Sequence, residues 1–242
     1  MGVLKVYGMP MSTNTVRVVA AINEKGLDYE LALVDLRTGA HKQPDFLALN
    51  PFGQIPVLQD GDVVLFESRA INRYLATKYK ESGEELLPAG SAALEVWLEV
   101  EAQQFGPAIS ELVFQLFIKP LLGSVTDAAA AEAQATKLGK VLDVYEERLA
   151  KNKYLAGDEF TLADLNHMPY INYLMRTPKA ELIAARPHVK AWWDAVSARP
   201  PGRKLQLPSP SDRSSSSGFC WNMTWMHGWC NGIPQFDDQF AE

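Results

Sequence analysis

The chain has 242 residues, of which 47% are hydrophobic and 21% are charged. This composition is typical of a globular protein with a sizeable core, and it excludes a wholly disordered or fibrous chain. The net charge of −6 has the wrong sign for a protein that binds by neutralising phosphates, so we expect no nucleic-acid partner.

The cysteines and the apolar runs indicate the compartment. Cys220 and Cys230 are too few for a disulfide framework, so nothing favours secretion. No run approaches the about 18 apolar residues of a membrane helix, and the N-terminus lacks a signal-peptide pattern. We therefore expect a cytoplasmic protein with no membrane partner.

The first elements alternate between strand and helix. Residues 3–8 read as a strand, and Thr13 to Lys25 read as a helix that stops at Gly26. Tyr29 to Leu36 reads as a second strand, followed by an irregular stretch that contains Pro44 and Pro51.

Two more strands and a helix complete this part. The strands are predicted over Ile55–Gln59 and Val63–Phe66, and the Asp60-Gly61 pair between them is a hairpin signal. Apolar residues then recur at helical spacing from Ile71 to Tyr79. The pattern predicts a small mixed sheet with helices, complete in about 80 residues.

Beyond this unit the chain changes character. The helical spacing of apolar residues disappears between Glu81 and Gly90, which predicts a linker over residues 81–90. It separates a domain at 1–80 from an all-helical domain at 91–205. Helix breaks are expected at Gly106–Pro107, Pro120, Gly157, Pro178 and Pro187. Residues 206–242 are a Ser- and Trp-rich tail, which we expect to be flexible.

Three segments that could bind a ligand lie where elements of the first domain begin or end. Ser12 precedes a helix, where unpaired N–H groups favour an anion, although a plain N-cap explains it too. Glu67 and Ser68 begin the next helix and could present polar groups to a ligand carboxylate, or act only as a cap. Pro56 opens a strand; if its bond is cis, the Ile55 backbone could pair with an extended peptide, whereas an ordinary trans proline is the alternative.

Other polar residues have structural explanations. Thr161 and Asp164 form a Thr-x-x-Asp capping box, and His167 and His188 are expected to be structural. Cys220, His227 and Cys230 fall short of a closed tetrahedral set, so we expect no metal. A serine hydrolase is disfavoured because no G-x-S-x-G motif surrounds Ser12.

The order of these motifs resembles that of glutathione transferases, and the plant phi class in particular. The resemblance rests on MSTNTVRV (11–18), NPFGQIPVLQDGD (50–62) and FESRAINRYLA (66–76), and it continues in YLAGDEFTLADL (154–165) and AWWDAVSARP (191–200). It implies an α+β thioredoxin-like N-terminal domain with an all-α C-terminal domain, and a homodimer. It covers about residues 3–205, so the tail departs from the family pattern.

The resemblance also implies the site residues. Ser12 matches the family's catalytic serine, and His41 and Lys42 match residues near the glycyl end of glutathione. Gln54 and Ile55 match the pair beside a cis proline, here Pro56, and Glu67 and Ser68 match the residues that hold the γ-glutamyl end. The apolar electrophile is expected to lie against the following residues: Met11, Leu36, Phe114, Phe117, Ile118 and Met175.

The implied activity is conjugation of the glutathione thiolate to small apolar electrophiles, with reduction of organic hydroperoxides as a further option. Glutathione would be a co-substrate, and no cofactor is expected. The alternative is a ligandin that carries flavonoid-like molecules without chemistry, although a pure carrier has no need of a thiolate donor. A thiol-transferase is a weaker option because that chemistry normally uses cysteine at the position of Ser12.

Overall fold

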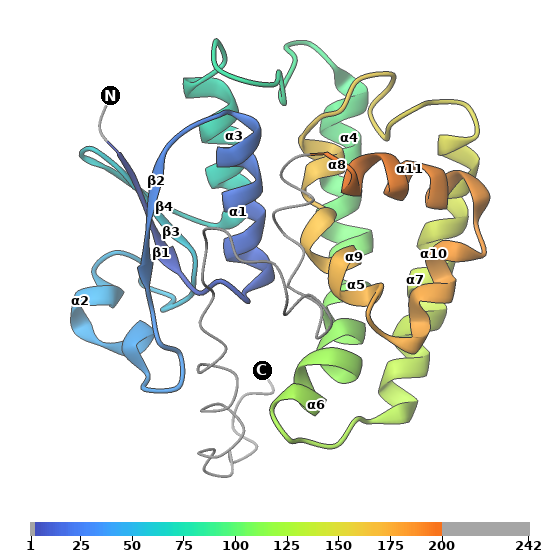
Figure 1. The fold of residues 1–242 in the computed structure, drawn as a ribbon, viewed down its shortest axis with the longest axis horizontal. Coiled ribbons are helices and arrows are strands. Elements are labelled where there is room, and N and C mark those ends of the chain that lie inside the picture. Colours follow the sequence, from blue (N-terminus) through green and yellow to red (C-terminus); the bar gives the residue numbers. More distant parts are fainter. Residues whose placement is uncertain (1–2, 200–242) are drawn as a thin grey trace, which may run out of the picture.

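The computed structural model describes residues 3–199. The tail predicted for residues 206–242, with its cysteines and tryptophans, lies outside this range. Within it the chain forms a small sheet-containing part and a larger helical part, as Figure 1 shows. The predicted fold class, an α+β N-terminal unit followed by an all-helical unit, is confirmed.

The sheet has four strands in the order β2-β1-β3-β4. They are β1 (Leu4–Gly8), β2 (Tyr29–Leu33), β3 (Val57–Asp60) and β4 (Val63–Phe66). Strand β1 is parallel to β2 and antiparallel to β3, which pairs antiparallel with β4. Helices α1 (Thr13–Glu24) and α3 (Ser68–Lys78) pack together on one face of this sheet.

The strand boundaries differ from those predicted. The second strand ends at Leu33 rather than Leu36, and the third begins at Val57 rather than Ile55. Pro56 has no N–H to give to a ladder, so regular pairing starts after it. The stretch predicted as irregular contains a 3₁₀ turn (Ala40–Lys42) and the short helix α2 (Pro44–Leu47), whose first residue is proline.

The second part contains no strand among its described residues. Its helices are α4 (Ala92–Val100), α5 (Gly106–Val113), α6 (Lys119–Leu121), α7 (Ala128–Leu149), α8 (Leu162–Leu165), α9 (Met168–Leu174), α10 (Glu181–Ala184) and α11 (Pro187–Ser197). A 3₁₀ turn, Pro178–Ala180, precedes α10, and α11 begins at Pro187, so the predicted breaks at those two prolines are correct. No described helix has the length and apolarity needed to cross a membrane.

The predicted helix break at Gly106–Pro107 is wrong, whereas the one at Pro120 lies one residue before the end of α6 at Leu121. The chain stays helical from 92 to 121, through Gly106–Pro107 and Pro120. A π-helical turn precedes each site: Glu101–Phe105 lies before Gly106–Pro107, and Phe114–Ile118 lies before Lys119–Pro120. A proline removes one backbone hydrogen bond and crowds the preceding turn, and at Gly106–Pro107 the wider π turn accommodates both effects without ending the helix.

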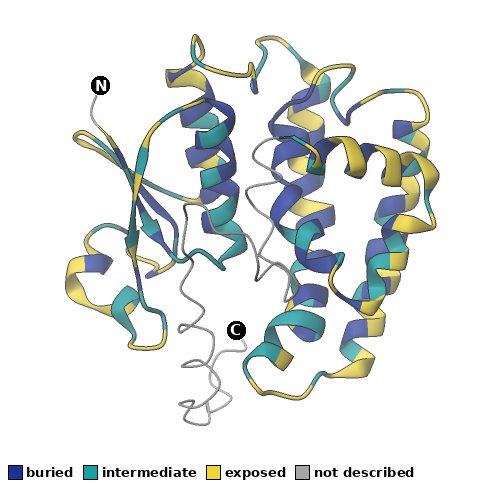
Figure 2. Ribbon diagram, viewed as in Figure 1, coloured by how far each residue is buried: buried dark blue, intermediate teal, exposed yellow. Residues whose placement is uncertain are grey.

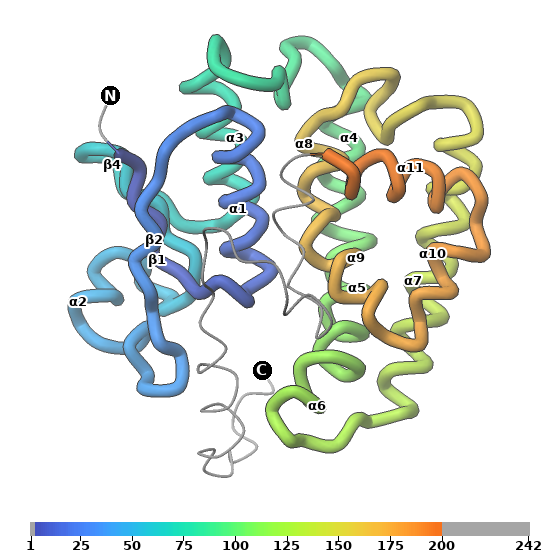
Figure 3. Tube along the Cα trace, in the orientation of Figure 1, coloured from blue at the N-terminus to red at the C-terminus, as the bar shows by residue number. Residues whose placement is uncertain are grey.

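The core continues from one part into the other. Figure 2 shows buried residues along α1 and α3 and on the inward faces of the helices across from them. Helix α1 contacts α8 and α9, so α1 and α3 lie between the sheet and the helical part, as the trace in Figure 3 shows. The loops at the N-terminal ends of α1 and α3 are thereby held beside the helical part.

Candidate functional site

Ser12 is the N-cap of α1. Its Oγ accepts a hydrogen bond from the backbone N–H of Thr15 at 3.3 Å, and its own N–H donates to the Met9 carbonyl at 2.9 Å. A hydroxyl accepts through its lone pairs and donates through its hydrogen, so capping leaves the Ser12 hydrogen free for a ligand. The cap and the anion-binding hypothesis are therefore compatible.

The segment before β3 has an unpaired backbone. The Ile55–Pro56 peptide bond is cis, and the Gln54 carbonyl accepts a hydrogen bond from Asn50 Nδ2 at 2.7 Å. The N–H and C=O of Ile55 bond to no other described residue. An extended peptide can add to such a backbone as a short extra strand.

The turn from β4 into α3 has a strained backbone. Glu67 has φ of 68° and is the one described non-glycine residue with positive φ. Such a conformation costs about 1–3 kcal/mol and persists where the surrounding structure over-determines it, often at binding sites. Here it turns the chain so that the Glu67 side chain and the first turn of α3 face one pocket.

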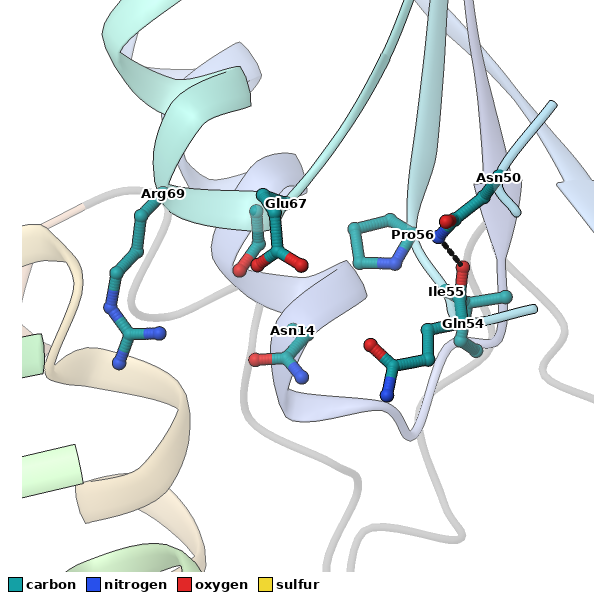
Figure 4. A pocket seen from close by; sticks show the side chains of 8 residues that line it. Asn14, Asn50, Gln54, Ile55, Pro56, Glu67 and Arg69 are labelled. Carbon is teal, nitrogen blue, oxygen red and sulfur yellow. Dashed lines mark hydrogen bonds between the residues drawn. The ribbon is translucent and has the colours of Figure 1, made fainter. Parts of the chain in front are cut away.

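That pocket joins three segments, as Figure 4 shows. Its lining residues are Asn14, Asn50, Gln54, Ile55, Pro56, Glu67, Ser68 and Arg69. Five of the predicted site residues therefore share it with three that the sequence analysis missed. Ser12, His41 and Lys42 do not line it, although Ser12 lies two residues before Asn14.

His41 and Lys42 lie on the 3₁₀ turn behind Gly53. A Cβ on Gly53 would come within 2.7 Å of the His41 carbonyl, so glycine is needed for this close approach. Lys42 Nζ donates to the Phe52 carbonyl at 3.1 Å. Burial and the charge of Lys42 lower the pKa of His41, whose buried Nδ1 has no partner among the described residues. The turn thus sits beside the Gln54 end of the pocket.

A buried charge cluster lies behind the Glu67 end. Arg69 makes two hydrogen bonds to the carboxylate of Glu101, at 2.6 and 2.9 Å, and Arg17 Nη2 lies 3.7 Å from the same carboxylate. Burial alone would raise the pKa of Glu101, but the hydrogen bonds of Arg69 and the charge of Arg17 outweigh it and hold the pKa below its usual value. Glu101 is therefore ionised.

The residues predicted for the electrophile lie outside this pocket. Phe117 stacks on Tyr173 with ring centroids 4.7 Å apart, and the Tyr173 hydroxyl donates to the Met11 carbonyl at 2.8 Å. Tyr173 thus links two of the predicted residues, and sequence reasoning missed it. The others are spread out: Ile118 and Met175 pack on the main core, Leu36 packs on a separate cluster with Val34, Phe46 and Val57, and Phe114 is exposed.

The predicted capping box is a structural feature away from the pocket. Thr161 Oγ1 accepts from the Ala163 N–H at 3.3 Å, and Asp164 Oδ2 accepts from the Thr161 N–H at 3.0 Å. His167 is buried and bonded to Tyr145 and to the Ala163 carbonyl. Within residues 3–199 no cluster of His, Cys, Asp and Glu could hold a metal.

Comparisons with known proteins show the family of the chain. The N-terminal domain of glutathione S-transferases matches residues 2–77, and the C-terminal domain of the same family matches residues 105–200. Glutathione S-transferase 3 of Zea mays is 62% identical over 223 residues, which cover 90% of this chain and all of the relative.

Two solved structures have the same fold. Glutathione transferase F7 from Populus trichocarpa aligns with a TM-score of 0.81 and 52% identity, covering 84% of this chain and 97% of its own. Maize glutathione S-transferase I, in complex with an atrazine glutathione conjugate, aligns with a TM-score of 0.79 and 48% identity, covering 84% and 96%. The chain therefore belongs to the glutathione S-transferase family, in its plant phi class.

Proposed function

We propose that the Ser12 hydroxyl ionises the thiol of bound glutathione, and that the resulting thiolate attacks a small apolar electrophile. The observation that carries the proposal is the N-cap geometry of Ser12, which leaves its hydrogen free at the positive end of α1. Serine acts here as a hydrogen-bond donor to sulfur and forms no covalent intermediate.

A lower thiol pKa would greatly increase the fraction of bound glutathione that is ionised. A free thiol with a pKa of about 8.5 is only about 3% ionised at pH 7, and the thiolate is the nucleophile. Lowering that pKa by about 2 units would raise the ionised fraction to about 75% and corresponds to about 2.7 kcal/mol of preferential thiolate stabilisation. One charge-assisted hydrogen bond and a helix N-terminus have this magnitude together.

The tripeptide would lie along the pocket as an extended strand. Its γ-glutamyl end would meet Glu67 and Ser68, and its cysteinyl backbone would pair with Ile55 beside Pro56 and Gln54. The glycyl carboxylate would reach the turn that carries His41 and Lys42. The unpaired Ile55 backbone and the shared lining of the other four residues support this placement.

The electrophile would lie beside the Met11–Ser12 loop, against Phe117 and Tyr173. These rings stack on each other, and the Tyr173 hydroxyl is bonded to this loop. A flat aromatic wall favours planar acceptors, because offset ring contacts add to the burial of apolar area. Leu36, Phe114, Ile118 and Met175 stay candidates for the same site.

Catalysis is better supported than carriage without chemistry. The relatives are named as transferases, and maize glutathione S-transferase I is described with a glutathione conjugate bound. A ligandin has no use for a group that ionises a thiol. Reduction of hydroperoxides stays a prediction of the resemblance.

The test uses glutathione and a chlorodinitrobenzene. In this reaction the C–S bond forms, the C–Cl bond breaks and chloride leaves, while the thiol proton passes to solvent. Ser12→Ala should lower kcat/KM at pH 7 by about tenfold or more and move the apparent pKa of its pH profile up towards about 8.5. Ser12→Thr keeps a hydroxyl and should retain more activity. An unchanged rate and pH profile in Ser12→Ala would overturn the role of Ser12.

Several further features of the protein are proposed with this activity. We expect a homodimer, which light scattering would measure, with glutathione as co-substrate and no separate cofactor. The domain limits at 1–80, 81–90 and 91–205 and the cytoplasmic location stay predictions of the sequence. The ends of two helices support a linker over residues 81–90, since α3 ends at Lys78 and α4 begins at Ala92.

A further inference from the structure

The guanidinium of Arg17 is fully buried behind the pocket, between the two parts of the protein. Its Nη1 donates to Asn14 Oδ1 at 2.6 Å and to Ser68 Oγ at 2.8 Å, and its Nε donates to the Asn166 carbonyl at 3.2 Å. One nitrogen with two hydrogens therefore holds two residues of the pocket wall, one from each helix.

These bonds decide which way the two polar groups face. An amide can present either its oxygen or its NH₂, and a hydroxyl can accept or donate. Arginine has no acceptor, so Asn14 must turn its oxygen to Arg17, and Ser68 must use a lone pair. The remaining hydrogens of Asn14 Nδ2 and Ser68 Oγ are then available to a ligand.

The position of Asn14 fits this orientation. In Figure 4 its oxygen lies on the side away from Gln54 and its nitrogen lies on the side towards Gln54. Asn14 Nδ2 donates to no other described residue. The amide therefore adds a hydrogen-bond donor to the part of the pocket that Ser68 also lines.

The charges at this end suit a group that carries both signs. Arg17 and Arg69 are balanced by Glu101, which pairs with both, and by Glu67, which lines the pocket. The four charges cancel, so a ligand bearing one carboxylate and one ammonium adds no net charge. The α-carbon of a γ-glutamyl residue bears this pair. A carboxylate accepts from donors such as Asn14 and Ser68, and an ammonium donates to a carboxylate such as Glu67.

We infer that Asn14 is a further substrate-binding residue, which donates a hydrogen bond to the α-carboxylate of the γ-glutamyl group, and that Arg17 is the positioning residue that orients it. This inference rests on the proposed function, because it takes glutathione as the ligand.

The experiment removes one partner at a time. Wild type, Asn14→Ala and Asn14→Asp are assayed with glutathione, with 4-aminobutyryl-Cys-Gly, which lacks the α-carboxylate, and with glutaryl-Cys-Gly, which lacks only the ammonium. A hydrogen bond to a charged group is worth enough that Asn14→Ala should lower kcat/KM for glutathione about tenfold or more. It should lower kcat/KM for the glutaryl peptide similarly and leave that for the aminobutyryl peptide unchanged.

The Asn14→Asp variant sharpens the test. Its carboxylate would keep the bond to Arg17 and the shape of the side chain but would lose both donor hydrogens and place a like charge beside the carboxylate of the ligand. With glutathione, kcat/KM should fall further in Asn14→Asp than in Asn14→Ala. With the aminobutyryl peptide, kcat/KM should again be unchanged. Asn23→Ala, at the other end of the same helix and outside the pocket, is the matched control and should behave as wild type with all three peptides.

Arg17→Lys tests the positioning role. An ammonium keeps the positive charge near Glu101 but cannot reproduce the fixed fork of a guanidinium. The variant should lose much of the preference for glutathione over the aminobutyryl peptide while keeping its folded circular-dichroism spectrum. Calorimetry of the three peptides gives the same comparison from binding affinities, without turnover. A variant that lost activity for another reason would therefore still show whether it discriminates between the peptides.

The outcomes separate the two proposals. If wild type neither binds nor turns over glutathione, the proposed function fails. If wild type is active and Asn14→Ala lowers kcat/KM equally for glutathione and the aminobutyryl peptide, or for neither, the inference about Asn14 fails alone. If Arg17→Lys keeps the full wild-type preference, the positioning role of Arg17 fails.

Discussion

The hydroxyl of Tyr173, on α9, donates a hydrogen bond of 2.8 Å to the main-chain carbonyl of Met11, the residue before Ser12. Burial raises the pKa of Tyr173 to about 12, so the hydroxyl keeps its proton and remains a donor at neutral pH. The helical part of the protein thereby holds the loop that carries the candidate catalytic serine.

Replacing Tyr173 with phenylalanine should therefore lower the free energy of unfolding by about 1 kcal/mol, because the Met11 carbonyl loses its donor. Urea unfolding measures the change. Tyr170→Phe is the control, since the Tyr170 hydroxyl makes no hydrogen bond to another described residue. An equal decrease in unfolding free energy in the two variants would mean that the hydrogen bond to Met11 does not stabilise the fold.

Phe117→Ala should weaken binding of a planar electrophile. The Phe117 ring stacks on Tyr173 at 4.7 Å, and such aromatic contacts are worth about 0.5–1.5 kcal/mol. We expect the KM for a chlorodinitrobenzene to rise about three- to tenfold, with the KM for glutathione unchanged. A rise confined to the KM for glutathione would place Phe117 outside the electrophile site.

Glu101→Gln should be strongly destabilising. The carboxylate of Glu101 is fully buried and is the counter-charge for the buried Arg17 and for Arg69. Removing one member of a buried ion cluster leaves an uncompensated charge, which costs about 3–5 kcal/mol of unfolding free energy. Glu99→Gln, which breaks an exposed pair with Arg73, should change stability by less than about 1 kcal/mol. The denaturant midpoints of the two variants measure this difference, and an equal decrease in both would contradict the prediction.

His167 should make the protein sensitive to acid. Burial lowers its pKa from 6.5 to about 4, and the neutral ring suits its two bonds, from Tyr145 to Nε2 and to the Ala163 carbonyl from Nδ1. The pKa of His167 is lower in the folded protein than in the unfolded chain. The neutral ring therefore stabilises the fold fully above pH 6.5, and this stabilisation is lost as the pH falls towards 4. It amounts to roughly 3 kcal/mol.

The measurement compares unfolding free energies of wild type and His167→Gln between pH 7 and 4. The variant should lose less stability than wild type over this range. The comparison is needed because burial raises the pKa of Asp164 to about 6, so that this carboxyl stabilises the fold as the pH falls through 6 and opposes His167. Parallel curves for the two proteins would show that His167 does not titrate in this window.

Thr161→Ala should cost about 1 kcal/mol of unfolding free energy, because it removes the hydroxyl that caps α8. Thr161→Ser keeps the hydroxyl and should lose less. Since the box lies away from the pocket, kcat/KM with glutathione should stay at the wild-type value in both variants. A large loss of kcat/KM with normal stability would mean that this cap acts on the site.

The predictable part of the site lies at element boundaries. Ser12, Ile55 with Pro56, and Glu67 with Ser68 were picked out because helix starts and strand ends have local signals that a sequence displays. Local signals are misleading at Gly106–Pro107, where they predict a break but the chain stays helical after a π turn at Glu101–Phe105. Propensity describes a proline in isolation, whereas here the packed helix around it absorbed the distortion.

The sequence by itself determined the order of the strands and of helices α1 and α3, the two-part fold and two segments that line the pocket, because hydrophobic periodicity and turn chemistry are properties of neighbours along the chain. Only the tertiary structure decided that Arg17 orients Asn14 and Ser68, and that Tyr173 holds Met11, a residue 162 positions earlier. Contacts of this kind depend on which surfaces pack together, and no local pattern encodes the partner of a buried guanidinium or hydroxyl.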